Sequence, residues 1–286
     1  MTLPETPPAR AHPVRALLVL DHPGFHPLPF PAEGYRATRV SSLDALLAAV
    51  RRAPPSTAVL VAPFGDPAGG PDPALEVLLA SAPLLPVVAA ADLGACAAAG
   101  VEMVLRWGVS EVVDIRLEGG PEALAPRFRA AHARPFKRRL EEQISRYLSA
   151  NAMTLVRAAA EVACDCGMGG DLAGVFGVNA RTVGNWCAAE GLPPPRRLLT
   201  WARVLLAAAL LEERTRSWNN VARSTGYVDA SGLRRAVSGL VRSARSGEAG
   251  RHRPSFETAM AAFDGELRQS RERLRGGYTP DDSARA

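Results

Sequence analysis

The 286-residue sequence predicts an α/β N-terminal part with a doubly wound parallel sheet, followed by an all-α part with two helix-turn-helix units. Short apolar runs alternate with helical patterns over residues 15–133, which is typical of a parallel sheet covered by helices. Residues 151–245 carry helical patterns only, and one motif occurs there twice. Apolar residues make up 47% of the chain, which suffices for a buried core and excludes a disordered protein.

The strands are predicted from apolar runs, because strands buried on both faces lack a polar–apolar alternation. We predict strands over residues 15–21, 35–40, 57–62, 85–90 and 111–115. The second of these differs from the others because it alternates with a period of two. Helical patterns begin at Ser41-Ser42, which supplies an N-cap, and recur over residues 73–80, 95–107 and 121–131.

Two further amphipathic patterns predict a connector helix and a C-terminal helix. The first, over residues 133–150, spaces Phe136, Leu140, Ile144 and Leu148 four apart. The second places Phe256, Met260, Phe263, Leu267 and Leu274 on one face of a helix. Either face could pack within the chain or form a homodimer contact, although four positions are too few to define a coiled coil. The predicted divisions are a sheet domain (1–134), a connector (135–150), a helical domain (151–250), and a C-terminal helix with a disordered tail (251–286).

The helical domain contains an internal repeat. Leu172-Ala173-x3-Gly177-Val178 recurs as Val221-Ala222-x3-Gly226-Tyr227, a shift of 49 residues. A helix-turn-helix needs a small residue where its helices come closest and a glycine at the turn, where φ is positive. Residues 135–253 also hold 18 Lys+Arg and 10 Asp+Glu, against 11 and 13 in residues 1–134. A repeated helix-turn-helix in a basic segment favours nucleic-acid binding.

The second copy extends into a longer motif. Arg203-Val204-x2-Ala207-x2-Leu210-Leu211 precedes Ser217-Trp218-x2-Val221-Ala222-x3-Gly226-Tyr227-x-Asp229-x-Ser231-x-Leu233-x-Arg235. This pattern resembles the DNA-binding domain of AraC/XylS-type transcription regulators, over residues 150–242. The resemblance implies two helix-turn-helix units, sequence-specific binding to double-stranded DNA, and a cytoplasmic location. It also implies a joining helix that begins at Pro194-Pro195 and buries Leu198, Leu199, Ala202, Leu205, Leu206, Ala209 and Leu210.

The chain departs from that family at the end of the second unit. Val237-Ser238-Gly239 stand where the family usually has an aromatic residue and a lysine, and the closing Gly-x-Ser-Pro is missing. Gly232 lies in the second predicted recognition helix, where a glycine costs about 1 kcal/mol relative to alanine. These departures leave a second interpretation open, in which the helical domain is a protein–protein adaptor that has lost specific DNA binding.

The second helix of each unit is predicted to enter the major groove, with Asn179 and Asp229 as N-caps. The predicted base contacts are Arg181, Thr182, Asn185, Ser231, Arg234 and Arg235. Arginine pairs with guanine and asparagine with adenine, and each pairing contributes about 1–3 kcal/mol of discrimination. The predicted phosphate contacts, which position the protein without reading sequence, are Arg196, Arg197 and Arg223. Trp186 and Trp218 are assigned to the core.

The N-terminal part resembles a response-regulator receiver domain. The resemblance is carried by Gly108-Val-Ser-Glu-Val-Val113, Pro121-Glu-Ala-Leu124, Arg127 and Arg129. A working receiver holds a metal and a phosphoryl group with clustered carboxylates, a hydroxyl and a lysine. The implied role here is dimerisation, binding of a protein partner, or ligand sensing.

Several positions argue that this receiver-like domain is not phosphorylated. Asp21 ends the first strand, but proline- and histidine-rich sequence, residues 22–31, replaces the first helix. The acceptor, hydroxyl and lysine positions are taken by Ala62-Pro63, Ala90-Ala91 and Ile115-Arg116. Asp66 is a remote candidate on a loop. We therefore expect no phosphoacceptor.

No pattern predicts an enzyme, a metal site or a cofactor. Cys96, Cys164, Cys166 and Cys187 lack a zinc spacing and are interpreted as structural thiols of a reduced cytoplasmic protein. His22 and His26 lie in a proline-rich stretch, and the glycine-rich stretches 65–70 and 166–170 do not fit phosphate-binding loops. No Ser/His/Asp or paired-carboxylate constellation stands out, and no apolar run has the ~20 residues that span a bilayer.

Overall fold

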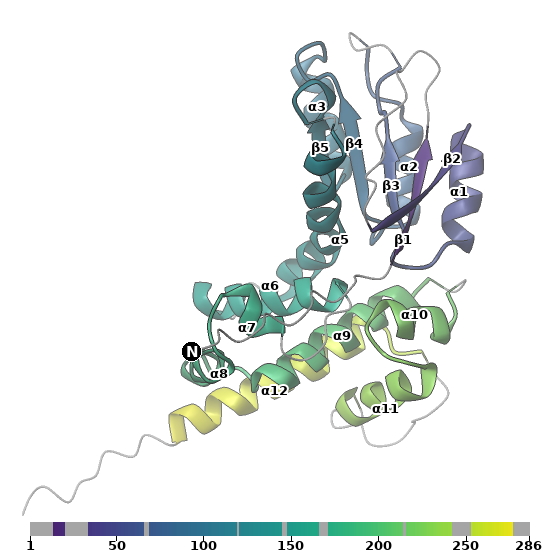
Figure 1. Cartoon of the computed structure of the whole chain (residues 1–286). Helices are drawn as coiled ribbons and strands as arrows, with labels where there is room; N and C mark the ends of the chain where they lie inside the picture. The colour runs from purple at the N-terminus through teal and green to yellow at the C-terminus, as the bar shows by residue number, and fades with distance from the viewer. Residues whose placement is uncertain are drawn as a thin grey trace, which may run out of the picture.

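The computed structural model arranges the chain as a parallel sheet with its helices, stacked on a bundle of further helices (Figure 1). It describes residues 14–20, 34–65, 69–118, 120–144, 148–165, 171–213, 216–241 and 253–276. The predictions made for Asp21, residues 22–31, Asp66, residues 166–170 and the tail after Gly276 lie outside the described residues.

Five parallel strands form the sheet, in the order β2-β1-β3-β4-β5. The strands are β1 (Arg15–Leu20), β2 (Tyr35–Val40), β3 (Ala58–Val61), β4 (Val87–Ala91) and β5 (Glu111–Asp114). β3 and β4 are buried at every position, as their unbroken apolar runs predict. β2 lies at the edge of the sheet and exposes its four middle residues, so the period of two in its sequence does not correspond to one buried face. The predicted parallel sheet is confirmed.

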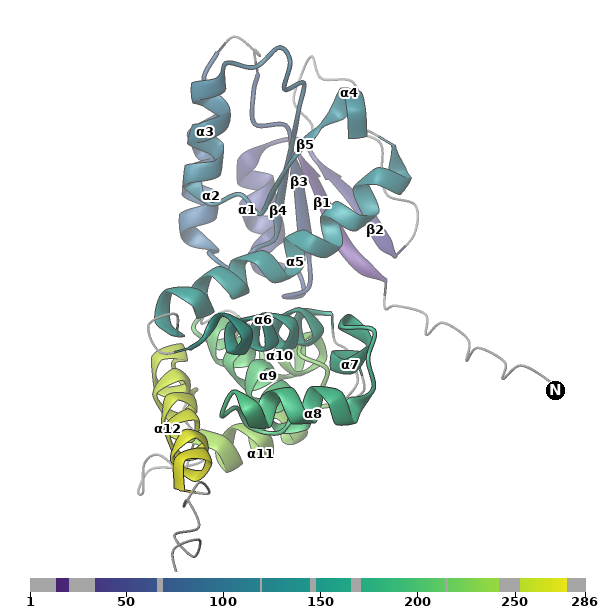
Figure 2. The ribbon, with the colours of Figure 1, turned by 90° about the vertical axis from the view of Figure 1, so that its left-hand side faces the viewer.

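Helices cover both faces of the sheet (Figure 2). The helices of this part are α1 (Leu43–Arg52), α2 (Ala74–Ser81), α3 (Ala98–Trp107), α4 (Ile115–Glu118) and α5 (Pro121–Ile144). Successive strand residues point to opposite faces, so Leu18 packs in the core beneath α1, α2 and α3, and Leu17 in the core beneath α5. The sheet is therefore doubly wound. Ser42 caps α1 as predicted, because its Oγ accepts a hydrogen bond from the Ala45 amide at 3.2 Å.

α5 joins two helices that were predicted as separate. The helix expected over residues 121–131 and the connector expected over 135–150 form one helix of 24 residues that ends at Ile144. Its first half packs Leu124 and Phe128 against the sheet, and its second half packs Phe136 and Leu140 against the helical bundle. Pro126 and Pro135 both lie inside this continuous helix.

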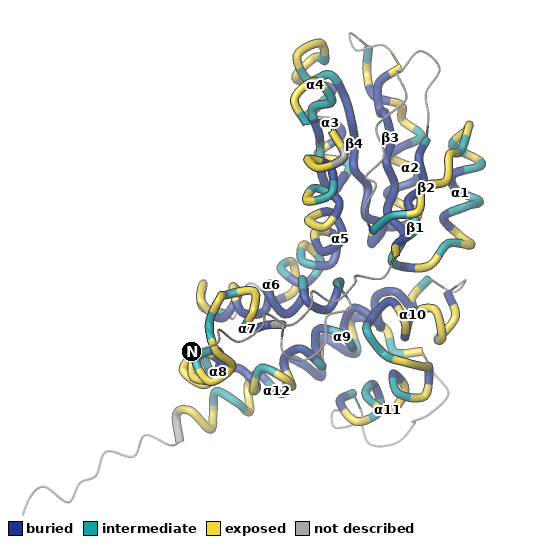
Figure 3. Tube along the Cα trace, viewed as in Figure 1, coloured by how far each residue is buried: buried dark blue, intermediate teal, exposed yellow. Residues whose placement is uncertain are grey.

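Seven helices form the described part of the C-terminal bundle. They are α6 (Ala150–Cys164), α7 (Asp171–Val175), α8 (Ala180–Ala189), α9 (Pro195–Leu211), α10 (Trp218–Ser224), α11 (Ala230–Val241) and α12 (Phe256–Gly276). α9 begins at Pro195, as predicted, and forms the centre of the bundle. Every side chain predicted for its buried face is buried, and so are Trp201 and Val204 on its other sides. Figure 3 shows α9 buried along its length, whereas α8 and α11 expose many residues.

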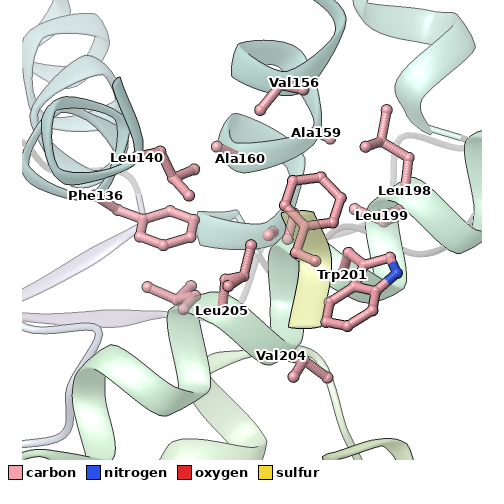
Figure 4. Close-up of a cluster of buried hydrophobic side chains, with 14 of the residues drawn as sticks. Phe136, Leu140, Val156, Ala159, Ala160, Leu198, Leu199, Trp201, Val204 and Leu205 are labelled. Carbon is pink, nitrogen blue, oxygen red and sulfur yellow. The ribbon is translucent and has the colours of Figure 1, made fainter. Parts of the chain in front are cut away.

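The apolar faces predicted for the connector and for the C-terminal helix pack within the chain, which is one of the two alternatives left open. Phe136 and Leu140 of α5 meet Val156 and Ala160 of α6 and Leu205 of α9 in one cluster (Figure 4). The apolar residues of α12 join the same core, except for Leu274, which is 49% exposed. None of the described helices has the length and apolar character needed to cross a membrane.

A buried arginine also ties the sheet to the bundle. Arg15 of β1 is 8% exposed, and its Nη2 donates to the Cys164 carbonyl at 3.2 Å and to Asp165 Oδ1 at 3.1 Å. Both acceptors lie at the C-terminal end of α6, where the helix dipole favours a cation. The first strand of the sheet thus holds the end of the first helix of the bundle.

His132 is expected to make this junction sensitive to acid. It is buried on α5 with its ring stacked on Tyr35, 6.1 Å between centroids, and its Nε2 has no hydrogen-bond partner among the described residues. Burial, with Arg15 nearby, lowers the pKa of His132 well below 6.5. As the pH falls, His132 is protonated in the unfolded chain before it is protonated in the folded chain. The free energy of unfolding should therefore be highest above about pH 6.5 and should decrease as the pH drops below that value.

Urea unfolding between pH 7.5 and pH 5 measures this effect. His132→Phe keeps the ring packing and removes the titrating group, so its stability should depend less on pH than that of the natural chain. Equal pH dependence in the two proteins would contradict the assignment to His132.

Candidate nucleic-acid interface

The two copies of the repeat form turns with the same backbone hydrogen bonds. Val178 N donates to the Ala173 carbonyl at 3.2 Å, and Tyr227 N donates to the Ala222 carbonyl at 2.8 Å. These bonds span five residues and end each first helix in a Schellman-type turn. The turn requires a residue in the left-handed region, which Gly177 supplies with φ 63° and Gly226 with φ 81°. The glycine spacing seen in the sequence thus has a local structural cause.

The second helix of each pair begins at the predicted cap. Asn179 Oδ1 accepts from the Thr182 amide at 2.9 Å, and Asp229 Oδ1 accepts from the Gly232 amide at 2.7 Å. The caps are 50 residues apart and the glycines 49, so the second turn is one residue longer. Both helices are anchored by a fully buried apolar residue, Val183 in α8 and Leu233 in α11. α8 and α11 both lie on the side of the bundle away from the sheet (Figures 1 and 2).

α8 presents two of its three predicted base contacts to solvent. Arg181 and Asn185 are exposed and lie one turn apart on the same face. Arg181 has no carboxylate partner among the described residues, so its guanidinium is free to bind a ligand. Thr182 is only partly exposed, and its hydroxyl bonds to Asn179 Oδ1 at 3.1 Å. Thr182 therefore belongs to the cap as well as to the surface.

Of the three predicted base contacts on α11, one is exposed to solvent and two line a hollow between α10 and α11. Arg235 is exposed and pairs with no described carboxylate. Arg234 instead reaches back toward α10, where its guanidinium lies over the Trp218 ring, 5.2 Å from the centroid. Ser231 and Arg234 both line a hollow between α10 and α11.

The predicted phosphate contacts also differ from one another. Arg196 and Arg223 are exposed, at the start of α9 and on α10. Arg197 is occupied by Glu266 of α12, to which it donates from both Nε and Nη2 (2.7 Å for the Nη2–Oε2 bond). Trp201 Nε1 donates to the same carboxylate at 2.8 Å, and the bond to Glu266 raises the pKa of Arg197. The assignment of Arg197 to phosphate is therefore replaced by an internal ion pair.

The two tryptophans assigned to the core are not alike. Trp186 is 40% exposed and meets Phe176 edge to face, at 5.6 Å between ring centroids. The core assignment is wrong for Trp186, because α8 uses Val183 and Cys187 for its buried face. Trp218 is partly buried against the core, and its ring also contacts the Arg234 guanidinium.

The cysteine thiols fit a structural role. Cys187 is fully buried, and burial raises its pKa to about 11, so it is a neutral thiol near pH 7. Cys164 is also buried, and Cys96 is partly exposed. No group of three His, Cys, Asp or Glu side chains in the described part of the chain is arranged to hold a metal ion.

The carboxyl ends of the strands lack receiver chemistry at the described positions. Ala62 is buried at the end of β3, and β4 ends in Ala90 and Ala91. Asp92 follows β4, and its carboxylate pairs with Arg116 at 3.6 Å. An internal ion pair thus occupies the edge of the sheet between β4 and β5.

Gly232 gives a test of local stability in α11. A Cβ at this position would lie 3.5 Å from Asp229 Oδ1 and 3.7 Å from Tyr227 Cδ1, which are ordinary contacts. Gly232→Ala should therefore stabilise the protein by roughly 0.5–1 kcal/mol and raise Tm in a thermal scan. Gly226→Ala is the matched control, since its φ of 81° should make the same change destabilising. A lower Tm for Gly232→Ala would contradict the expectation.

Comparison with known proteins adds no relative to this picture. No protein-family model, curated protein or solved structure matches the chain. The functional argument therefore depends on the geometry of the two helix pairs and on the arginines they expose.

Proposed function

We propose that the chain is a sequence-specific DNA-binding transcription regulator of the cytoplasm, in which α8 and α11 enter the major groove. The observation that carries the proposal is the repeated turn: two capped helices, each held by a positive-φ glycine, project from opposite ends of the buried α9. Arg181 and Arg235 then stand exposed on the two helices with no described carboxylate to neutralise them. Two helices that read one duplex face would lie one helical turn apart, ~34 Å.

The cations of the bundle support the same assignment. Several arginines and the lysine are used within the chain, through the ion pairs Lys137–Glu161, Arg139–Glu212, Arg157–Glu141 and Arg197–Glu266. Arg181, Arg196 and Arg235 have no such partner among the described residues. Positive charge is thus left available on α8, α11 and the start of α9. Phosphate neutralisation by such side chains makes DNA binding fall steeply with salt.

The α/β part would then serve as a sensing or partner-binding domain that needs no phosphorylation. Its strand order is the one found in response-regulator receivers. Met103 of α3, which is 41% exposed, lines a hollow of about 580 Å³ together with Trp107 and Arg138. Arg138 belongs to the half of α5 that packs on the bundle. A ligand in this hollow would therefore contact both the sheet domain and the helix that joins it to the bundle.

Selection from a pool of random duplexes at two salt concentrations tests the proposal. The expected result is an enriched motif with two boxes about one turn apart and retention that falls steeply with salt. Retention without any motif would contradict sequence-specific binding.

The adaptor function is the second candidate, and one observation favours it. Val175 and Trp186 expose apolar surface on α7 and α8, at 47% and 40%, beside the predicted groove contacts. A protein partner would cover such a patch. If the protein retains no duplex even at low salt, the regulator function is wrong and the adaptor function takes its place.

A further inference from the structure

We propose that the hollow between α10 and α11 holds one phosphodiester of the DNA backbone, and that Arg234 is a phosphate-binding residue, not a base-reading one. This inference rests on the proposed DNA-binding function and specifies how α11 uses its two adjacent arginines. The hollow has a volume of about 450 Å³ and lies open to solvent. Its polar lining consists of Ser217, Asn219, Asp229, Ser231, Arg234 and Arg253.

The position of Arg234 carries the assignment. Its guanidinium lies over the Trp218 ring at 5.2 Å, so the side chain folds back from α11 toward α10. Stacking uses the face of the guanidinium and leaves the N–H donors at its edge free. A fork of parallel donors matches two oxygens of a phosphate, and no described carboxylate occupies it. Arg235, the next residue, is exposed and does not line the hollow, so it remains the base contact of α11.

The charged side chains that line the hollow favour an anionic group. Arg253 brings a second guanidinium, which is anchored by the carbonyls of Leu211 at 3.5 Å and Glu213 at 3.4 Å. Asp229 contributes one negative charge, but its Oδ1 already accepts from the Gly232 amide. The lining therefore holds two arginines and one carboxylate, which favours an anion. The Ser231 hydroxyl and the Asn219 amide add neutral donors at the same place.

The location of the hollow favours a DNA phosphate over a free anion. It lies beside the first turn of α11, next to the helix that presents Arg235. A duplex whose bases reach Arg235 would pass its backbone over this hollow. A phosphate contact here would fix the register of α11 on the duplex without reading its sequence.

The test compares Arg234→Ala with Arg235→Ala on two duplexes, the one enriched from the random pool and one of unrelated sequence. Arg234→Ala should weaken binding to both duplexes by the same factor, and should lower the slope of log affinity against log salt by about 1. Arg235→Ala should weaken the enriched duplex more than the unrelated one. Circular dichroism of each variant checks that α11 is folded.

Further variants separate the parts of the site. Arg234→Lys keeps the charge but loses the fork and the stacking, so it should preserve the salt slope while losing part of the affinity. Trp218→Leu removes the ring that positions Arg234 and should weaken both duplexes equally, whereas Trp218→Phe should restore binding. A merely structural role for Trp218 would lower thermal stability without this rescue of DNA affinity.

The outcomes distinguish this inference from the function on which it rests. A natural chain that binds neither duplex overturns the DNA-binding function and the inference together. Selective loss of the enriched duplex in Arg234→Ala overturns the inference alone, because it makes Arg234 a base contact, and so does unchanged binding. Inorganic phosphate that stabilises the natural chain but not Arg234→Ala, with unchanged duplex binding, would assign the hollow to a free anion and overturn the DNA contact.

Discussion

Arg181→Ala is expected to weaken binding to the enriched duplex by about 5- to 150-fold, the equivalent of about 1–3 kcal/mol for one lost base contact. The side chain is exposed on α8, one turn from Asn185, and has no described carboxylate partner that could compensate for its loss. Because it is predicted to read a base, the unrelated duplex should lose less affinity than the enriched one. Fluorescence anisotropy with both duplexes, at constant salt, measures the difference.

Arg51→Ala is the matched control for this variant. Arg51 is an exposed arginine in the last turn of α1, and α1 packs on the sheet. Its removal changes the net charge by the same amount and should leave the ratio between the two duplexes unchanged. If Arg181→Ala and Arg235→Ala both bind like the natural chain, the assignment of α8 and α11 to the groove is wrong.

Phe136→Ala is expected to lower the free energy of unfolding by about 3–5 kcal/mol, the largest stability effect we predict. Phe136 is 1% exposed and packs with Leu140, α6 and α9 in the core of the bundle (Figure 4). Truncation removes an aromatic ring from a site enclosed by three helices, which leaves a cavity. Urea unfolding followed by far-ultraviolet circular dichroism measures the loss.

Two further variants serve as controls for Phe136→Ala. Phe136→Leu refills most of the volume and should cost less than about 1.5 kcal/mol. Leu117→Ala changes a side chain that is 83% exposed on α4, and should stay within about 0.5 kcal/mol of the natural chain. A cost below 1 kcal/mol for Phe136→Ala would mean that α5 does not hold the bundle as described.

Local patterns predicted most helices, strands, turns and caps, because the residues that determine each of them lie close together in the sequence. The strands β3 and β4 follow from unbroken apolar runs, and α9 from its proline start and its apolar residues. The turns at Gly177 and Gly226 could be predicted because only glycine adopts their positive φ without strain. The caps at Asn179 and Asp229 follow from the same local chemistry.

Contacts between distant segments could not be predicted, because no local sequence pattern marks them. Arg197 and Glu266 are 69 residues apart, and nothing near either residue indicates that α12 lies along α9 and neutralises the arginine. The continuity of α5 was missed because its two halves pack on different parts of the chain, and no local pattern shows that they form one helix. Arg234 and Arg235 look equivalent in the sequence, and only the position of the Trp218 ring distinguishes them.

The continuity of α5 also sets how this chain can be divided or recombined. A cut after residue 134 would divide α5 in its middle and leave Leu124 and Phe128 on a shortened helix with the sheet. The bundle would then start at residue 135 and keep Phe136 and Leu140 on the other part of the divided helix. Exchange of either part with another protein would have to supply a new covering helix to the part left behind. The sheet and the bundle thus share one helix, and neither keeps that helix whole when the chain is cut there.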